Sequence, residues 1–199
     1  MPHEKFDVTK LERLNDPARL EYLDPDVMWR ALGSPTPGAI VEIGAGTGVF
    51  ARRFAELAPG AQVYAADIEP AMIRWMAENI PPEVRGRLHP VLSRETAVPL
   101  PTGEADLVVT INLHHELADP LATYAEAMRL LRIDGQLLVA DWAPGAPGGP
   151  TEHIRVPAEQ IAEILSRVGF QAVEIHSGLS RHSLVTGVKP AVCGVSGAK

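Results

Sequence analysis

Glycines at alternate positions form the first group of residues that could do chemistry in this 199-residue chain. Residues 41–50 read Val-Glu-Ile-Gly-Ala-Gly-Thr-Gly-Val-Phe, so that an apolar run opens onto Gly44, Gly46 and Gly48 and a helical pattern follows. Glycines leave no Cβ in the way of a ligand, and the N–H groups at the start of the helix favour an anionic or strongly polar group. A turn that serves only strand-to-helix packing is the alternative.

Two acids flank this glycine corner in ways that suit a nucleoside ligand. Asp67 follows the next apolar run, 23 residues after Gly44, where a carboxylate can accept hydrogen bonds from a ribose diol. Ile68 beside it could form an apolar wall for an adenine. Glu42 stands two residues before Gly44 and could supply negative potential to a cationic ligand. Alternatively, Asp67 only caps the following helix, and Glu42 only holds the glycine loop through backbone bonds.

Two neighbouring histidines, His114 and His115, follow a third apolar run. Imidazole titrates near neutrality, so either residue could remove a proton from a reacting group as the catalytic base. Each could instead close a ligand pocket or be satisfied by a backbone carbonyl. Adjacent histidines on an extended segment point apart, and no H-E-x-x-H helix is present, so we expect no metal site from them with Glu116 and His153.

A fourth group of polar and aromatic residues follows the fifth apolar run. Asp141 and Trp142 end this run, and His153 and Arg155 come after a loop rich in proline and glycine at residues 143–150. These four side chains could contact a substrate, or they could only anchor the loop.

The apolar periodicity predicts an α/β protein built on a doubly wound sheet. Strands are expected at residues 39–43, 62–66, 87–92, 106–111, 136–140, 170–176 and 182–188, with helices between most of them. Strands one, four and five are almost continuously apolar, as in a parallel sheet covered on both faces. The last two strands are joined only by the short segment Ser-Gly-Leu-Ser-Arg. Because so short a segment cannot form a crossover connection, the mostly parallel, seven-stranded sheet should end in an antiparallel hairpin. In such a sheet the ligand lies across the carboxyl ends of the strands.

Length predicts a single domain over residues 1–199, with a helical N-terminal cap at 1–37, a ligand-binding core at 38–189 and a flexible tail at 190–199. The formal net charge of −7 argues against a nucleic-acid partner, because phosphate binding needs a Lys/Arg surface. No apolar run approaches the roughly 20 residues of a membrane span, and the N-terminus lacks a signal-peptide core. We therefore expect a cytoplasmic monomer or homodimer in which the single cysteine, Cys193, is an incidental thiol.

The glycine corner resembles motif I of the class I S-adenosylmethionine (SAM) methyltransferases, E/D-x-G-x-G-x-G. The resemblance extends over about residues 38–189 and includes the acid Asp67, the stretch 99–109 (Pro-Leu-Pro-Thr-Gly-Glu-Ala-Asp-Leu-Val-Val) and the turn 131–135 (Leu-Arg-Ile-Asp-Gly). The sequence is most similar to small-molecule methyltransferases such as those of quinone biosynthesis. The resemblance implies SAM as the donor, S-adenosylhomocysteine (SAH) as the product, and a set of cofactor-binding residues: Glu42, Gly44, Ala45, Gly46, Gly48, Asp67, Ile68, Glu95 and Asn112.

The sequence departs from the family pattern at two places. The family usually has an acid after strand three that pairs with the adenine amino group, whereas this chain has Arg94 there. Glu95 could take that role after a one-residue shift, or a backbone carbonyl could. The usual Arg-Pro-Gly-Gly turn before strand five reads Arg-Ile-Asp-Gly, in which Asp134-Gly135 preserves the turn chemistry.

We therefore expect an enzyme that moves a methyl group from SAM to a small-molecule acceptor by direct displacement. Enzymes that methylate amide or nucleobase nitrogens often carry Asn-Pro-Pro-Tyr after strand four, and its absence at residues 112–115 also argues against a nucleic-acid target. One alternative is a SAM-binding sensor or partner subunit without turnover. Another is an NAD(P)-dependent oxidoreductase, which the spacing of the third glycine and the terminal hairpin disfavour.

Overall fold

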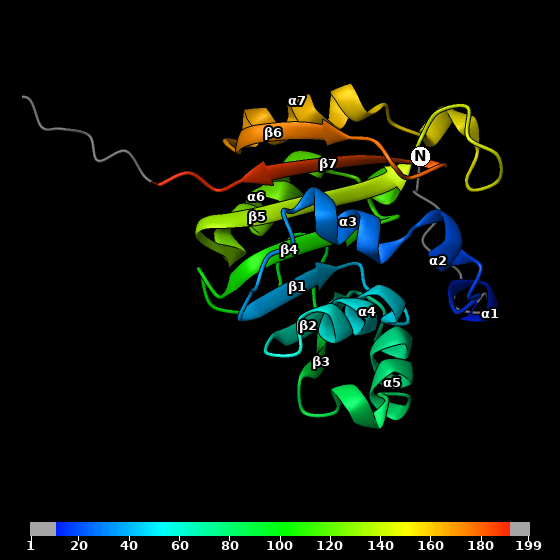
Figure 1. Ribbon diagram of the computed structural model, residues 1–199, viewed down its shortest axis with the longest axis vertical. Helices are drawn as coiled ribbons and strands as arrows, with labels where there is room; N and C mark the ends of the chain where they lie inside the picture. Colours follow the sequence, from blue (N-terminus) through cyan, green and yellow to red (C-terminus); the bar gives the residue numbers. More distant parts are fainter. Residues whose placement is uncertain (1–10, 192–199) are drawn as a thin grey trace, which may run out of the picture.

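A seven-stranded sheet forms the centre of the protein in the computed structural model, which describes residues 11–191. The strand order is β3-β2-β1-β4-β5-β7-β6, and β7 runs antiparallel to both of its neighbours while the other pairs are parallel (Figure 1). The strands are β1 (Ala39–Ile43), β2 (Gln62–Asp67), β3 (Leu88–Leu92), β4 (Ala105–Ile111), β5 (Leu131–Trp142), β6 (Gln171–His176) and β7 (His182–Val188). The predicted doubly wound sheet with a terminal antiparallel hairpin is confirmed.

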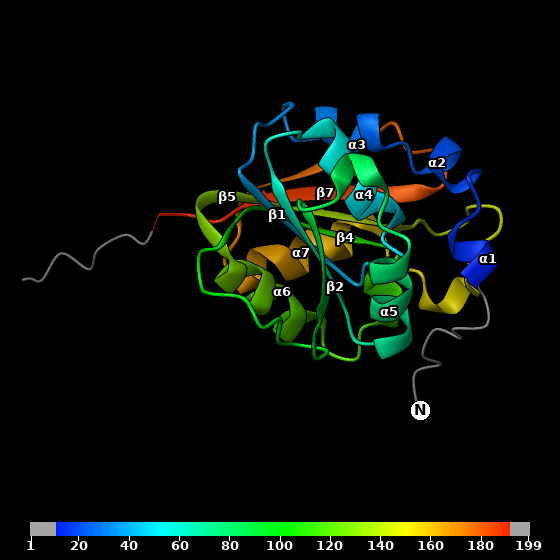
Figure 2. The same ribbon diagram turned by 90° about the horizontal axis from the view of Figure 1, so that it is seen from below.

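Helices cover both faces of this sheet. The α-helices are α1 (Leu11–Leu14), α2 (Arg19–Tyr22), α3 (Pro25–Ala31), α4 (Val49–Leu57), α5 (Pro70–Glu78), α6 (Pro120–Leu130) and α7 (Ala158–Val168), with short 3₁₀ turns η2 (Pro82–Val84), η3 (His114–Glu116) and η4 (Glu152–Ile154). Figure 2 shows α3 and α4 on one side of the strands and α6 and α7 on the other. Successive strand residues face opposite sides, so Ile40 belongs to the core cluster under α3, α4 and α5, and Val41 to the cluster under α6 and α7.

Side-chain caps begin two of the helices, α3 and α6. Asp24 caps α3 by accepting a hydrogen bond from the Asp26 N–H at 2.8 Å, and Asp119 caps α6 through the Ala122 N–H at 3.0 Å. A proline occupies the first position of each of these helices. At the other end of α7, Gly169 adopts φ 110°, a left-handed conformation that terminates the helix at low cost.

The start of β5 differs from the prediction. A turn was expected at Asp134-Gly135 before a strand at 136–140, but β5 already begins at Leu131 and passes through a bulge in which Asp134 has φ 62°. The backbone N–H of Asp134 donates to the Lys189 carbonyl at 3.0 Å, and the Lys189 N–H donates to the Gly135 carbonyl at 2.9 Å. These two bonds keep the irregular segment paired within the sheet, so it does not leave as a turn.

A loop without a helix connects β3 to β4, and a partly buried ion pair on α6 holds it in place. Glu126 accepts hydrogen bonds from the Val98 N–H and from Arg129, each at 2.7 Å. Arg129 donates in turn to the carbonyls of Val98 at 3.1 Å and Leu100 at 3.0 Å. The loop therefore owes its position to α6 and leaves the carboxyl end of β3 open to the cleft described below.

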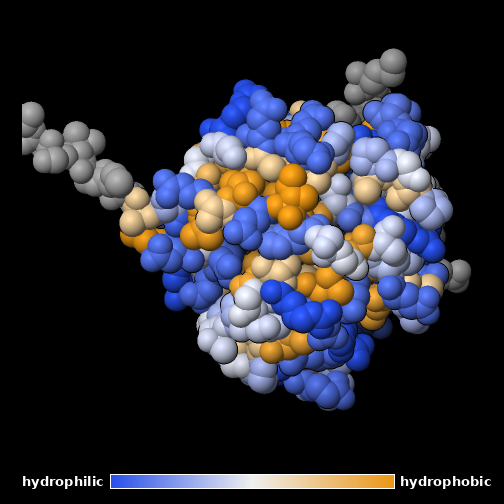
Figure 3. Space-filling model, turned by 45° about the horizontal axis from the view of Figure 1, so that its top comes forward, coloured by the Kyte–Doolittle hydropathy of each residue, from blue (hydrophilic) through white to orange (hydrophobic). Residues whose placement is uncertain are grey.

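Large exposed apolar side chains lie on separate elements, namely Leu92, Leu121, Ile133 and Ile175. On the face seen in Figure 3, hydrophobic residues likewise form small patches between hydrophilic ones. Within residues 11–191, no helix has the length and apolar character needed to cross a membrane. Cys193 and most of the predicted tail lie outside the described residues.

Candidate active site

A cleft opens at the carboxyl ends of β1, β2, β3 and β4 and has a volume of about 1160 Å³, its open mouth included. Strands β1 and β4 are neighbours in the sheet, and the chain leaves them toward α4 on one face and α6 on the other. Such a switch point is where open α/β sheets bind ligands. Leu14 of α1 and Arg19 of α2 also line this cleft, so the N-terminal helices form part of its wall.

The glycine corner between β1 and α4 has a backbone conformation in which residues other than glycine would be strained. Gly44 has φ 76°, and a Cβ at this position would lie 2.7 Å from Cδ1 of Leu113. Gly48, the residue before α4, has φ 75°, and a Cβ there would lie 2.8 Å from Sδ of Met76. The corner therefore packs closely against Leu113 after β4 and against α5, and it also brings Gly44, Ala45 and Gly46 to the wall of the cleft.

Asp67 ends β2 and links the glycine corner to the start of α5. Its Oδ2 accepts the Gly46 N–H at 2.7 Å, and its Oδ1 accepts the Glu69 N–H at 2.9 Å. The side chain is largely buried and lines the cleft. Burial raises the pKa of Asp67, although the backbone donors act in the opposite direction. A carboxylate has about four lone-pair sites, so these two bonds leave acceptor capacity that faces the cleft.

Glu42 lies within β1 under the glycine corner with only 1% of its surface exposed. Its Oε2 has no hydrogen-bond partner among the described residues 11–191. Burial raises the pKa of Glu42 to about 8; the backbone N–H of Ala51 and the charge of Arg19 lower it, and Asp67 raises it, by smaller amounts. A buried carboxyl group with a free oxygen is costly unless a ligand completes it, and Glu42 lines the cleft.

Asn112 follows β4 on the opposite side of the cleft from Asp67. Its φ of 54° places it in the left-handed region, which asparagine tolerates better than most residues. The backbone N–H donates to the Ala140 carbonyl at 2.8 Å, whereas the buried side-chain Oδ1 has no partner within residues 11–191. Asn112 is thus a second unpartnered oxygen at the cleft, held in a strained backbone conformation.

Ile68 and Glu95 also line the cleft, at the carboxyl ends of β2 and β3. Arg94, which stands where the family has an acid, joins them in the cleft wall and pairs through its backbone with Ala97. The Arg94 N–H donates to the Ala97 carbonyl at 2.9 Å, which fixes the turn that presents Glu95.

The segment 114–116 forms the 3₁₀ turn η3, where we had expected an extended chain. Three residues per turn send three successive side chains in three directions. His114 turns toward α6, where its Nδ1 lies 2.6 Å from the Tyr124 hydroxyl, and it is 4% exposed. His115 turns toward β5, where its Nδ1 lies 2.7 Å from Oδ1 of Asp141. Glu116 turns toward the cleft and lines it, whereas neither histidine does.

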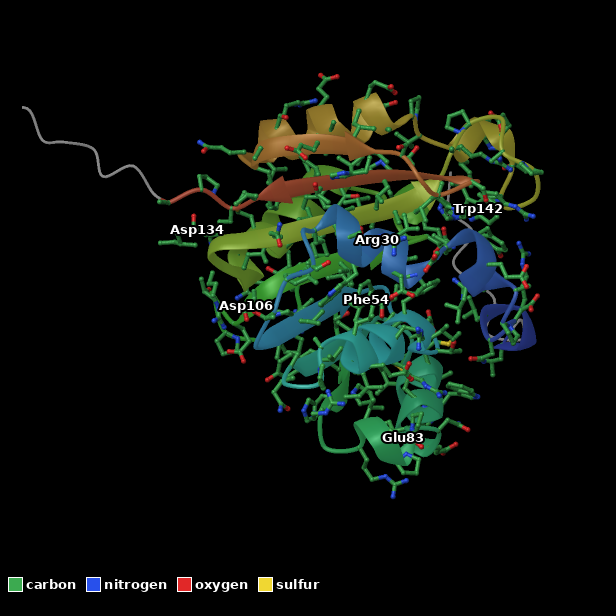
Figure 4. All side chains as sticks on the ribbon, viewed as in Figure 1. Arg30, Phe54, Glu83, Asp106, Asp134 and Trp142 are labelled. Atoms are coloured by element: carbon green, nitrogen blue, oxygen red, sulfur yellow. The ribbon has the colours of Figure 1, made fainter. Side chains whose placement is uncertain are left out.

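Asp141 and Trp142 end β5 beside this turn. Asp141 is 1% exposed. Its Oδ1 also accepts the Trp142 N–H at 2.7 Å, and its Oδ2 accepts the His115 N–H at 3.4 Å, so all three contacts are internal. Figure 4 shows Trp142 at the end of the sheet nearest α2, far from Asp106 and Asp134. The Trp142 ring packs against Tyr22 and His182, at centroid distances of 5.8 and 4.3 Å.

The two residues predicted beyond the proline-glycine loop do not line the cleft. Arg155 donates to several carbonyls of the loop, including Ala143 at 3.3 Å and Pro150 at 2.7 Å, and its side chain is almost fully buried. His153 lies exposed in η4. The contacts of Arg155 therefore fit the second of the two predicted roles, in which it anchors the loop. Among the described residues, no group of three or more His, Cys, Asp or Glu side chains is arranged to hold a metal ion.

Two residues at this end of the sheet, Arg19 and His182, were not singled out from the sequence, and neither was the role of a third, Glu116. Arg19 stacks on Phe50 at 5.1 Å from the ring centroid and lines the cleft, but nothing in a short N-terminal helix indicates that it folds back over the glycine corner. His182 lies stacked on Tyr22, 5% exposed, and neither of its ring nitrogens has a partner within residues 11–191. Glu116 lies in the segment after β4 that the strand-end rule selects, but from the sequence it was considered only as a metal ligand and not as an acid or base.

Comparisons with known proteins agree with this geometry. Residues 41–139 match the family described as "Methyltransferase domain". The malonyl-[acyl-carrier protein] O-methyltransferase of Geobacter sulfurreducens is 30% identical over 156 residues, which cover 70% of this chain and 58% of that protein. The demethylmenaquinone methyltransferase of Thermus thermophilus is 32% identical over 136 residues, covering 65% of this chain and 61% of that protein.

A solved structure shares the whole fold. The SAM-dependent methyltransferase from Aquifex aeolicus superposes with a TM-score of 0.85 and 24% identity, covering 92% of this chain and 99% of that one. The chain spans between half and three fifths of the length of the curated relatives it matches first, 51% to 58%. The matched residues contain the glycine corner, Asp67 and the turn η3, which form the cleft. The chain belongs to the class I SAM-dependent methyltransferase family.

Proposed function

We propose that this protein is an enzyme that transfers a methyl group from SAM to a small-molecule acceptor and releases SAH. The observation that carries the proposal is the cleft at the glycine corner, where buried oxygens of Glu42 and Asn112 stand without partners in the described part of the chain. Unpaired buried acceptors favour a ligand that brings N–H donors and positive charge. SAM carries an ammonium and a sulfonium group, so the residues present fit this donor.

Different residues of the cleft bind different parts of the donor. Asp67 accepts hydrogen bonds from the ribose diol with the lone pairs that Gly46 and Glu69 leave free. Glu42 and Asn112 face the cationic amino-acid end. Ile68 forms the apolar wall for the adenine. The adenine amino group pairs with Glu95 or with a backbone carbonyl of the same turn. Gly44, Ala45, Gly46 and Gly48 keep the corner open for this ligand.

The donor supplies an electrophilic methyl group, which the acceptor attacks in line with the departing sulfur. Alignment of two bound reactants contributes about 7–11 kcal/mol, whereas a general base adds about 10²- to 10⁴-fold in rate. The protein's main task is therefore to hold both partners at the carboxyl ends of β1 and β4. Of the two predicted catalytic histidines, His115 is the one that a buried carboxylate orients, while His114 is held against α6 by Tyr124.

A small molecule is the acceptor class that the chain supports best. The net charge of −7 disfavours nucleic acid. The relatives named above act on a malonyl-[acyl-carrier protein] in one case and on demethylmenaquinone in the other, so their names give no single acceptor. Asp141 and Trp142 close the same end of the sheet and are proposed to shape the acceptor side, with His153 and Arg155 acting through the loop.

Two measurements test this function. SAH at ~100 times its dissociation constant should stabilise the protein by about 2.7 kcal/mol, seen as a higher melting temperature. Incubation with methyl-labelled SAM and a metabolite extract should then move the label to a small molecule. Absence of the thermal shift would refute SAM binding. Binding without transfer would favour the non-catalytic sensor, and a change in NADH fluorescence on mixing would favour the oxidoreductase.

A further inference from the structure

Three neighbouring side chains, Asp141, His115 and Glu116, lie in that order from the interior of the sheet to the cleft. Asp141 lies buried at the end of β5, and its Oδ1 is 2.7 Å from Nδ1 of His115. On the other side of the ring, Nε2 of His115 lies 3.7 Å from Oε1 of Glu116. The His115 side chain is 8% exposed, whereas that of Glu116 is 34% exposed and lines the cleft. Glu116 is thus the member of the line that a bound acceptor can reach.

The contacts of Asp141 fix the orientation of this line. A single ring nitrogen of histidine bonds to the carboxylate, so the pairing at Nδ1 leaves Nε2 pointing toward Glu116. Asp141 is itself held by the Trp142 N–H at 2.7 Å. The 3₁₀ turn η3 places His115 and Glu116 on successive positions that point in different directions. The ring therefore bridges a buried acid and an acid at the cleft wall.

The groups around the line raise the pKa values of His115 and Glu116. Burial lowers the pKa of His115, but the bond and charge of Asp141 and the charge of Glu116 outweigh it, so the pKa of His115 is raised. Burial raises the pKa of Glu116, and His115 opposes this. Asp67 at the end of β2 also raises the pKa of Glu116. His114 on η3, Arg155 beyond the loop and His182 on β7 are the other charged or titratable groups that face these residues. Both pKa values are shifted upward, and the raised pKa of Glu116 makes its carboxylate a better proton acceptor.

We propose that Glu116 is the catalytic base of the methyl transfer and passes the acceptor's proton to His115, with Asp141 as the positioning residue. This proposal rests on the function proposed above. It assigns the acceptor to the class of protic nucleophiles, meaning a hydroxyl, a phenol or hydroquinone, or an amine N–H. A carboxylate acceptor has no proton to lose at neutral pH, so its methylation would not need a catalytic base.

The step balances without any further reactant. The acceptor's lone pair forms the bond to the methyl carbon, and the electron pair of the C–S bond passes to sulfur, which becomes the neutral thioether of SAH. The proton on the acceptor heteroatom moves to the Glu116 carboxylate and then to Nε2 of His115. The resulting imidazolium is stabilised by Asp141 at Nδ1, and the proton leaves to solvent after product release.

A titration of His115 tests whether the line is coupled. Chemical shifts of the His115 ring should give a pKa above the ordinary value of about 6.5 in the wild-type protein, because two carboxylates face it. Both Glu116→Gln and Asp141→Asn should lower this pKa. The control Glu56→Gln removes a surface carboxylate from α4 and should leave it unchanged. A His115 pKa that Glu116→Gln does not move would overturn the relay.

Methyl transfer to a panel of acceptors tests the assigned class. The panel contains a simple alcohol, a phenol, 1,4-naphthohydroquinone, a primary amine and a malonyl thioester with a free carboxylate. We expect transfer to a protic member, with kcat lowered about 100-fold or more in Glu116→Gln and the KM for SAM unchanged. Transfer only to the malonyl thioester, transfer to no protic member, or full activity of Glu116→Gln would each overturn the proposal.

The two proposals fail in distinguishable ways. A wild-type protein that binds neither SAM nor SAH in calorimetry refutes the methyltransferase function itself. A wild-type protein that binds SAM and transfers its methyl group, while Glu116→Gln does so equally well, leaves the function intact and refutes only the base. Removal of the Glu116 carboxylate should leave the dissociation constant of SAH unchanged, because this residue serves the acceptor rather than the ribose or adenine.

Discussion

The buried Glu42 predicts a pH dependence that distinguishes the two forms of the cofactor. Burial raises the pKa of Glu42 to about 8, so the carboxyl group of the free protein is mostly protonated at neutral pH. SAM carries a sulfonium charge that SAH lacks, and this charge favours the ionised carboxylate. SAM should therefore bind with loss of the Glu42 proton, whereas SAH should depend on this ionisation less.

The size of the effect follows from the distance between the pKa and the working pH. One pKa unit corresponds to about 1.4 kcal/mol, so ionising Glu42 before SAM binds costs about that amount at pH 7 and about 2.7 kcal/mol at pH 6. The affinity for SAM should rise about 50-fold between pH 6 and pH 8 and then level off. The raised pKa of Glu42 also affects the stability of the ligand-free protein, because the folded state holds the proton more tightly than the unfolded state. The contribution of Glu42 to the free energy of unfolding should therefore decrease as the pH rises from the unfolded pKa of about 4.3 toward 8.

Isothermal titration calorimetry in two buffers of different ionisation enthalpy measures both quantities. The dissociation constants for SAM and SAH are determined from pH 6 to 8.5 in the wild-type protein and in Glu42→Gln, which keeps the shape of the side chain. Glu42→Gln should remove most of the pH dependence for SAM. Equal slopes for SAM and SAH in the wild-type protein, or a slope that Glu42→Gln retains, would refute the assignment of Glu42 to the cationic end of the donor.

Other residues give shorter predictions. Asp67→Ala should weaken SAM binding by at least about tenfold in calorimetry, since charge-assisted bonds to the ribose are lost; unchanged affinity would mean that Asp67 only anchors the Gly46 and Glu69 N–H groups. Glu126→Ala should lower the free energy of unfolding by about 1–3 kcal/mol, because Arg129 and the Val98 N–H lose their partner. Arg129 lowers the pKa of Glu126 against the opposing effect of burial, so this stabilisation should be present above the unfolded pKa and disappear on acidification in denaturant titrations. His182→Phe should raise the melting temperature, because it removes two buried nitrogens that have no partner in residues 11–191; an unchanged or lower value would show that the imidazole is hydrogen-bonded in solution, for example to buried water.

The sheet could be predicted because its signals are local. The almost continuously apolar strands around Ile40, Val108 and Leu138 reflect burial on both faces, and these side chains are indeed fully buried. Helix starts at Pro25 and Pro120 follow from caps that the sequence displays. The bulge at Asp134 could not be predicted in this way, since it depends on pairing with Lys189, which lies 55 positions further along the chain.

The site residues at the ends of strands could be predicted from the sequence. The directions of the side chains in the turn after β4 could not. Glu42, Asp67 and Asn112 follow from the rule that ligands lie at the carboxyl ends of parallel strands, and all three line the cleft. The roles of these residues as donor ligands stay predictions. The direction of each side chain in the segment 114–116 depends on whether it forms an extended chain or a 3₁₀ turn, and the sequence did not reveal the turn. Because the segment forms the 3₁₀ turn, the member of it that lines the cleft is Glu116.

The short turn after β4 connects the fold with the chemistry. In an extended segment, alternate residues point to the same side, so His114 and Glu116 would face the cleft together or turn away together. In the 3₁₀ turn, His114 is free to pair with Tyr124 of α6, His115 with Asp141 of β5, and Glu116 to reach the cleft. One local change of backbone thus anchors the turn to a helix, connects it to the neighbouring strand and presents a carboxylate at the cleft. A substitution that straightens the turn should therefore disturb all three contacts at once, whereas Glu116→Gln should disturb only the last.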